Sequence, residues 1–182
     1  MNRIIKCATP QYLNESLDLV ERVFTDSEGE ESGKIVRSLV EEIRSKKFYV
    51  PELELIMVDE DDCVIGYAMF SRFHLEGKYE NQLLLLSPVA VETKLQRQHI
   101  SKELIEEGFL RATEMGYEVV IVEGNPQNYN ARGFKTSCNY GIVASSQIGI
   151  PSVDCLMVKE LVNGSLKNFK GVVDYSDYQY LT

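Results

Sequence analysis

A six-residue stretch that follows an apolar run and opens a helical pattern points to the binding of a ligand. The apolar run is Leu83–Val91, the stretch is 96–101, and the helical pattern covers about 97–115. A strand that turns directly into a helix aims several backbone N–H groups at one place, together with the positive end of the helix dipole. A phosphate-bearing ligand suits that place, so the sequence predicts an anion site at the start of this helix.

The elements around this stretch predict a βαβ unit. Apolar residues recur at helical spacing up to Met115, and Gly116 ends the pattern. The apolar run 118–122 is typical of a short buried strand, and parallel strands joined by a helix form a right-handed unit. Glu123 stands at the carboxyl end of that strand, and a short helix is expected over 124–131.

The rest of the chain alternates between strand and helix patterns, which predicts a mixed sheet with helices on both faces, in the α/β or α+β class. We expect strands at 3–8, 53–58, 63–73 and 153–161, helices at 11–24 and 34–45, and an acidic loop at 26–33. The 182 residues fit a single domain, with a core of about 3–162 and a C-terminal extension over 163–182. Three tyrosines of the extension are expected to pack along a sheet edge or at a dimer contact: Tyr175, Tyr178 and Tyr180.

The charge balance excludes a nucleic-acid binder. The chain has 28 acidic and 19 basic residues and a net charge of −9, whereas nucleic-acid binding favours a basic face. A cationic or amine substrate fits this balance, and solubility explains it equally well. No apolar run reaches the roughly 20 residues that a membrane span needs. The first residues are too few and too polar for a secretory signal, so we expect a cytoplasmic protein with no membrane partner.

The cysteines and histidines do not form a metal-binding pattern. Four cysteines stand at long, unrelated intervals, no C-x-x-C pair occurs, and the chain has only two histidines. Structural zinc sites draw their ligands from closely spaced Cys and His pairs. We therefore expect no metal cofactor.

Two segments match the motifs of a known family. Residues 88–101, which end in Gln96-Arg97-Gln98-His99-Ile100-Ser101, resemble the acetyl-CoA motif Q/R-x-x-G-x-G/A of the GNAT acyltransferase superfamily. Residues 124–134, from Gly124-Asn125-Pro126 to Gly133-Phe134, resemble the G-D-P-x-Y-Y-x-x-x-G-F signature of its YhbS-like subgroup. Residues 153–164 are similar to that subgroup's final strand. The resemblance follows nearly the whole chain in element order and is specific over about 83–134.

The resemblance implies a fold and an activity. The fold is a mostly antiparallel central sheet in which one parallel pair, formed by the strands at Leu83–Val91 and 118–122, splays apart. The activity is transfer of an acetyl group from acetyl-CoA to a primary amine of a small molecule or peptide, by direct attack in a ternary complex. The cofactor-binding residues that it implies are Val89, Ala90 and Val91 for the pantetheine arm, Gln96, Arg97, Gln98, His99, Ile100 and Ser101 for the pyrophosphate, and Asn125 and Tyr129.

The resemblance also implies the two catalytic residues. Tyr129 occupies the motif's tyrosine position, where a phenol protonates the departing thiolate, and Glu123 is the best-placed carboxylate to take the amine's proton. Each residue has a plainer alternative. Tyr129 alone would be interpreted as a half-buried packing residue, and Glu123 as a strand-end carboxylate whose charge is satisfied locally.

The motif is altered at the pyrophosphate loop. His99 and Ser101 stand where the family has glycine and glycine or alanine, and Glu92 with Thr93 replaces the usual proline after the strand. Glycine lets a backbone approach a phosphate closely, whereas an imidazole either contacts the phosphate or fills its place. A second reading is therefore a catalytically weak member of the fold that binds a ligand or partner without turnover. Related folds often pair, which leaves a homodimer open, and the acceptor's identity is not readable from the sequence.

Overall fold

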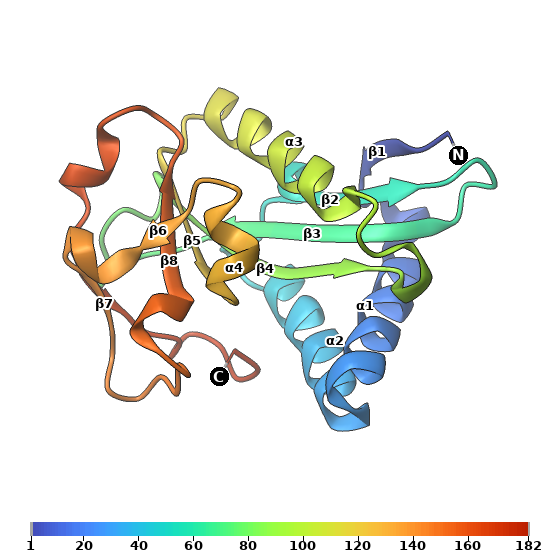
Figure 1. Cartoon of the computed structure of the whole chain (residues 1–182), viewed down its shortest axis with the longest axis horizontal. Helices are drawn as coiled ribbons and strands as arrows, with labels where there is room; N and C mark the ends of the chain where they lie inside the picture. The colour runs from blue at the N-terminus through green and yellow to red at the C-terminus, as the bar shows by residue number, and fades with distance from the viewer. Residues whose placement is uncertain (1, 182) are drawn as a thin grey trace.

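The protein is built on one long twisted sheet and a small second sheet (Figure 1). The computed structural model describes residues 2–181. The seven-stranded sheet has the order β1-β2-β3-β4-β5-β8-β6, and β7 pairs with β9. The strands are β1 Ile4–Cys7, β2 Glu54–Val58, β3 Val64–Arg72, β4 Leu83–Val91, β5 Val119–Glu123, β6 Lys135–Thr136, β7 Ile142–Ala144, β8 Leu156–Glu160 and β9 Gly171–Val173; the α-helices are α1 Leu13–Glu28, α2 Glu30–Ser45, α3 Ile100–Glu114 and α4 Pro126–Asn130.

The strand directions confirm the predicted fold class. In the long sheet, β4 and β5 are parallel, while the pairs β1–β2, β2–β3, β3–β4, β5–β8 and β6–β8 are antiparallel. The parallel pairing covers only Leu83–Leu85 of β4 against Val119–Ile121 of β5. The register of β4 against β3 also shifts between Ala68 and Phe70, a bulge that bends the strand just beyond this pairing. The two strands therefore open away from each other toward their carboxyl ends.

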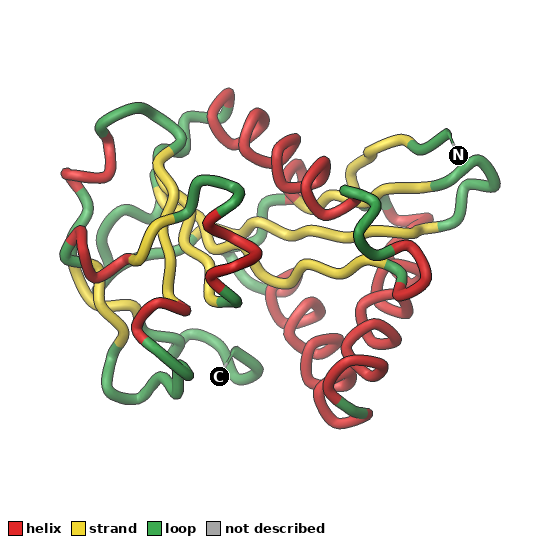
Figure 2. The backbone as a smooth tube through the Cα atoms, viewed as in Figure 1, coloured by secondary structure: helices red, strands yellow, loops and turns green. Residues whose placement is uncertain are grey.

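The helices cover both faces of the sheet, as the alternating side chains of the strands require. Val119 and Ile121 of β5 face the hydrophobic cluster that contains the buried residues of α1 and α2. Val120 and Val122 face the other cluster, to which α3 contributes. Figure 1 and Figure 2 show α1 and α2 together on one side of the sheet and α3 on the other.

The predicted acidic loop at 26–33 is wrong. The chain is helical up to Glu28 and again from Glu30, and Gly29 alone makes the connection with a φ of 102°. Glycine adopts this conformation without a steric cost, so a single residue reverses the chain. Glu30 and Glu31 in the first turn of α2 interact favourably with the helix dipole, so the acidic composition is compatible with a helix here.

Two element boundaries and one additional strand also differ from the predictions. Helix α3 begins at Ile100 and not at 97, because Arg97 and His99 have φ values of 63° and 66°, outside the helical region. The late strand is shorter than 153–161, since a 3₁₀ turn over Val153–Cys155 precedes β8. The C-terminal segment contributes a strand of its own, because β9 pairs in parallel with β7.

Among residues 2–181, no helix is long and apolar enough to cross a membrane. Within the same range, no three side chains of His, Cys, Asp or Glu gather in a way that would hold a metal ion.

Candidate active site

The loop before α3 keeps a glycine-like backbone without glycine. Arg97 and His99 both have positive φ, and His99 is the N-cap residue of α3, with no hydrogen bond from its side chain to the helix. Histidine is one of the few residues other than glycine that enters this region with some frequency, at a modest energetic cost. The loop therefore presents its N–H groups at the helix start even though His99 replaces the expected glycine.

A cleft of about 770 Å³ lies where this loop meets the opening between β4 and β5. It collects side chains from four separate elements, one of which is α1 through Val23, and no local pattern places them together. The other three elements contribute Val89 and Val91 of β4, Gln96, Arg97, His99, Ile100, Ser101, Lys102 and Ile105 of α3 and the loop before it, and Asn128, Tyr129, Ala131 and Arg132 of α4 and the residues after it. Most of the residues expected to bind a cofactor are thus brought to one place.

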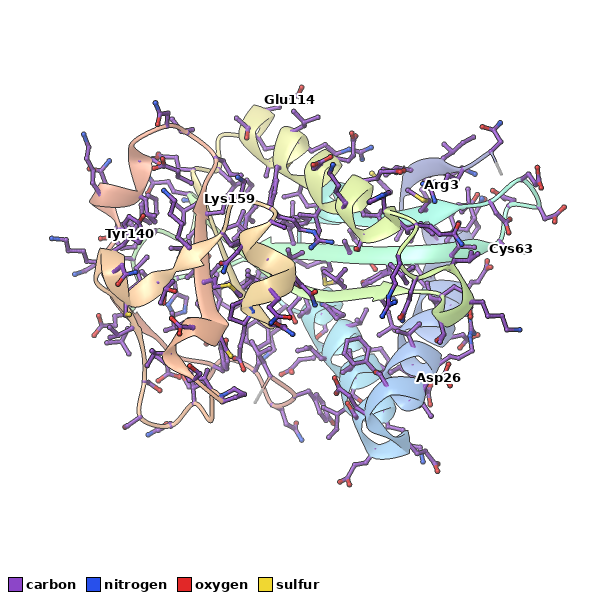
Figure 3. All side chains as sticks on the ribbon, viewed as in Figure 1. Arg3, Asp26, Cys63, Glu114, Tyr140 and Lys159 are labelled. Carbon is purple, nitrogen blue, oxygen red and sulfur yellow. The ribbon has the colours of Figure 1, made fainter. Side chains whose placement is uncertain are left out.

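Three of the expected cofactor-binding side chains lie elsewhere. Ala90 points to the α1 and α2 face, where it is buried at 2% exposure. Gln98 is exposed, and its carbonyl oxygen accepts a hydrogen bond of 2.9 Å from Arg3, which Figure 3 labels near β1. The side chain of Asn125 caps α4 by accepting a 2.9 Å bond from the N–H of Gln127. A role for these three residues therefore rests on their backbone or on the shape of the loop.

Tyr129 is held in the cleft by α4. Its ring packs edge-on against Phe134 at 5.5 Å, and a Cβ atom on Gly124 would lie 2.6 Å from the ring, so glycine is needed there for close approach. Burial raises the pKa of Tyr129, and the Arg132 guanidinium opposes part of this increase. The phenol therefore stays protonated at neutral pH, the state in which it can act as an acid.

Glu123 has a partner that the sequence did not indicate. The hydroxyl of Tyr175 donates a hydrogen bond of 2.9 Å to Glu123 Oε2. Burial and the nearby Glu123 carboxylate raise the pKa of Tyr175 far above its usual range, so the phenol donates at any working pH. No other described residue donates a hydrogen bond to the second oxygen, Oε1 of Glu123, which leaves it available to accept a proton.

The packing of two of the three tail tyrosines, Tyr175 and Tyr178, differs from the expected sheet-edge or dimer contact, while Tyr180 is only partly buried. Tyr175 and Tyr178 are buried at 6% and 7% exposure in the cluster shared with α1 and α2. Tyr175 packs edge-on against Phe73 at 6.2 Å. Because Glu123 meets Tyr175 on this face while Tyr129 packs in the α3 cluster, the candidate base and acid lie on opposite faces of the sheet, and only Tyr129 is among the residues that line the cleft.

The acidic Glu92 before the loop is neutralised by α1. Its Oε2 lies 2.7 Å from Arg22 Nη2. The next residue, Thr93, donates a 2.8 Å hydrogen bond to Asp26, which Figure 3 labels on α1. Both contacts fasten the loop to α1, and the ion pair with Arg22 offsets a negative charge that would otherwise weaken an anion site.

The splayed parallel strands, the helix N-terminus beside them and the cleft between them define an acyl-CoA N-acyltransferase fold. Comparison with known families agrees, since the model of the acetyltransferase (GNAT) family matches residues 16–140. The chain belongs to this family of N-acetyltransferases, which confirms the resemblance that its two motifs indicated.

Individual relatives extend this result. The chain is 28% identical over 141 residues to an uncharacterized N-acetyltransferase, YhbS, of Escherichia coli K12. The matched region covers 77% of this chain and 80% of the relative. The crystal structure of Escherichia coli YhbS in complex with CoA matches with a TM-score of 0.85 at 25% identity, over 99% of this chain and 92% of that one. A GNAT acetyltransferase of Brucella melitensis in complex with acetyl-CoA matches with a TM-score of 0.60 at 28% identity, over 74% and 83% of the two chains.

Proposed function

We propose that this protein transfers an acetyl group from acetyl-CoA to a primary amine of a small molecule or peptide, by direct attack in a ternary complex. The observation that carries the proposal is the cleft at the strand opening, which joins a helix N-terminus, the free edge of β4 and the Tyr129 phenol. Two relatives that have CoA or acetyl-CoA bound support it.

The residues of the cleft fit such a cofactor. Beyond Leu85, β4 has no partner on its β5 side among the described strands, so its backbone on that edge is free to pair with the amides of a pantetheine arm. The N-terminus of α3, with Arg97 and Lys102 close by, suits the pyrophosphate. Bound acetyl-CoA supplies an acetyl group activated as a thioester.

The chain's own residues then divide the proton transfers. Oε1 of Glu123 accepts the proton of the attacking amine while Tyr175 holds the other oxygen. Backbone N–H groups near Val89 and Val91 stabilise negative charge on the acyl oxygen. The Tyr129 hydroxyl donates its proton to the departing sulfur, and because the two residues lie on opposite faces of the sheet, base and acid do not compete for one proton.

The proposal is tested by calorimetric titration of the protein with acetyl-CoA and with free CoA, followed by a thiol-release assay over a panel of amines and peptides. Micromolar binding, about −8 kcal/mol, together with release that depends on one class of amine supports the proposal. Binding with no release from any amine favours the alternative of a GNAT-fold binding protein. Absence of heat with both ligands would contradict the cofactor assignment.

The Glu123→Gln variant is expected to lose activity in a pH-dependent way. At pH 7 the kcat/KM for the amine falls on the order of tenfold, because the amide keeps the Tyr175 contact but accepts no proton. The loss shrinks as the pH rises, since more of the amine arrives without its proton. A pH profile of kcat/KM measures this, with Glu118→Gln just before β5 as the control. Equal rates at every pH would mean that the carboxylate only anchors Tyr175.

The His99→Gly variant is expected to bind CoA more tightly. The backbone at this position already has a φ of 66°, which glycine keeps, so the main change is removal of an imidazole that lines the cleft. We expect the Kd of CoA to fall by a factor of roughly three to ten in calorimetry. Lys94→Gly, in the preceding turn and outside the cleft, controls for added loop flexibility. Weaker binding would show that the imidazole itself contacts the cofactor.

A further inference from the structure

Arg132 bridges two elements that border the cleft. It stands just after α4, which ends at Asn130, and its Nη2 donates a hydrogen bond of 2.9 Å to the hydroxyl of Ser101 in the first turn of α3. A second nitrogen, Nη1, is bonded to the carbonyl oxygen of Asn128. The guanidinium is therefore fixed beside the helix N-terminus that is suited to a phosphate.

The charge of this guanidinium is not balanced by the protein. No carboxylate among residues 2–181 lies within ion-pair distance of Arg132, whereas several arginines of the helices are paired, such as Arg22 with Glu92 and Arg37 with Asp18. Its Nε is buried and has no hydrogen-bond partner among the described residues. A charged group whose buried donor has no partner is costly, and an anionic ligand in the cleft that Arg132 lines would balance the charge of the guanidinium.

We propose that Arg132 is a direct ligand of the pyrophosphate of CoA and that the Ser101 hydroxyl holds it in place. The inference rests on the proposed function and adds a residue to it. Ser101 stands at the second glycine position of the motif, and a glycine or alanine there would offer no hydroxyl to Arg132. The altered loop has thus exchanged part of its backbone phosphate site for a side-chain cation supplied by another element. Arginine binds phosphate oxygens through several parallel N–H groups, which suits this role.

The position of Arg132 also decides which measurement is informative. Its guanidinium carbon lies 5.9 Å from the centre of the Tyr129 ring, so substitution changes the surroundings of the candidate acid as well. A loss of turnover alone would therefore not separate the two effects. Comparing the binding of CoA with that of a fragment that lacks the pyrophosphate and the nucleotide separates them.

The test compares wild type and Arg132→Gln by calorimetric titration with CoA and by competition with pantetheine, which lacks the pyrophosphate and the nucleotide. We expect the Kd of CoA to rise on the order of tenfold to a hundredfold in the variant, and the affinity for pantetheine to stay unchanged. The Kd of CoA should also depend less steeply on NaCl concentration in the variant. Ser101→Ala should weaken CoA binding less than Arg132→Gln, because it removes only the group that holds the arginine.

Two controls make the outcomes distinct. Lys94→Gln removes one positive charge from an exposed turn outside the cleft and should leave the Kd of CoA nearly unchanged. Arg132→Lys keeps the charge without the planar fork and should recover part of the affinity, which also guards against misfolding of the glutamine variant. Equal CoA affinity in Arg132→Gln and wild type, or an equal loss for CoA and pantetheine, would overturn the inference. Failure of the wild type to bind CoA would instead contradict the proposed function.

Discussion

Substitution of Tyr129 by phenylalanine is expected to lower kcat by a factor on the order of 10² or more and to leave CoA affinity almost unchanged. The variant removes only the hydroxyl group, which in the proposed mechanism donates the proton to the departing sulfur. The ring stays, and with it the edge-on contact to Phe134 and the close approach to Gly124. Thiol release at saturating acetyl-CoA measures kcat, and calorimetry with CoA measures affinity.

The protonation state of Tyr129 determines the pH range over which the effect of Tyr129→Phe should stay constant. Because burial raises its pKa, the phenol keeps its proton up to and beyond the pH at which a free tyrosine would lose it. The effect of Tyr129→Phe should therefore be constant from pH 6 to about pH 9, well below the ordinary tyrosine pKa. Tyr140→Phe, at a tyrosine that Figure 3 labels away from α4, is the matched control and should retain full activity. An undiminished kcat in Tyr129→Phe would leave the residue a packing role only.

The part of the site that the sequence predicted is the part with local signals. Strand β4, the helix after it and strand β5 each carry a regular apolar pattern. A right-handed connection follows from their order. The position of Tyr129 followed from a motif of closely spaced residues. These features depend on neighbours in the chain, so they are visible without a structure.

The connection between α1 and α2 was not predictable in the same way. Residues 26–33 are polar or glycine throughout. Such a segment is equally typical of a loop and of the exposed last turn of one helix followed by the exposed first turn of the next. The helices meet closely here, since a Cβ on Gly33 would clash with Thr25 Oγ1. That contact, and not the composition, decides in favour of two helices.

The partners of the candidate catalytic groups also lie beyond local reach. Tyr175 follows Glu123 by 52 positions in the chain, and Arg132 meets Ser101 across 31. No spacing rule links such positions, because the contacts arise only when the sheet and helices are packed. The sequence therefore located the cleft, but not the hydroxyl of Tyr175 that holds the candidate base Glu123 or the hydroxyl of Ser101 that holds Arg132.

The largest loss of stability is expected for Glu54→Ala, which opens a buried polar network away from the cleft. Glu54 has no solvent exposure, and its Oε1 lies 2.5 Å from Arg44 Nη2. The hydroxyls of Tyr67 and Tyr49 donate to the same carboxylate at 2.7 Å and 2.5 Å. Arg44 also donates a 2.9 Å bond to Ser16, so the network joins α1 and α2 to strands β2 and β3.

Removal of one partner from such a network leaves a buried charge without compensation, which typically costs about 3–5 kcal/mol. We expect Glu54→Ala to lose about that much of the free energy of unfolding, a large share of the roughly 5–15 kcal/mol of a typical domain. The melting temperature should fall by roughly 10 °C in a chain of this length, measured by calorimetry or circular dichroism. Glu30→Ala, which breaks an exposed ion pair with Lys34, is the control and should leave the melting temperature unchanged.

A double variant identifies the source of this loss. Arg44→Met combined with Glu54→Gln removes both charges, fills much of the same volume and leaves an amide oxygen that can accept the Tyr67 hydroxyl. If the unpaired guanidinium is the main cost in Glu54→Ala, the double variant should be more stable than Glu54→Ala, because paired charges that are removed together leave nothing uncompensated. A double variant that is as unstable as Glu54→Ala would show that the hydrogen bonds of Tyr49 and Tyr67, and not the ion pair, carry the stability of this network.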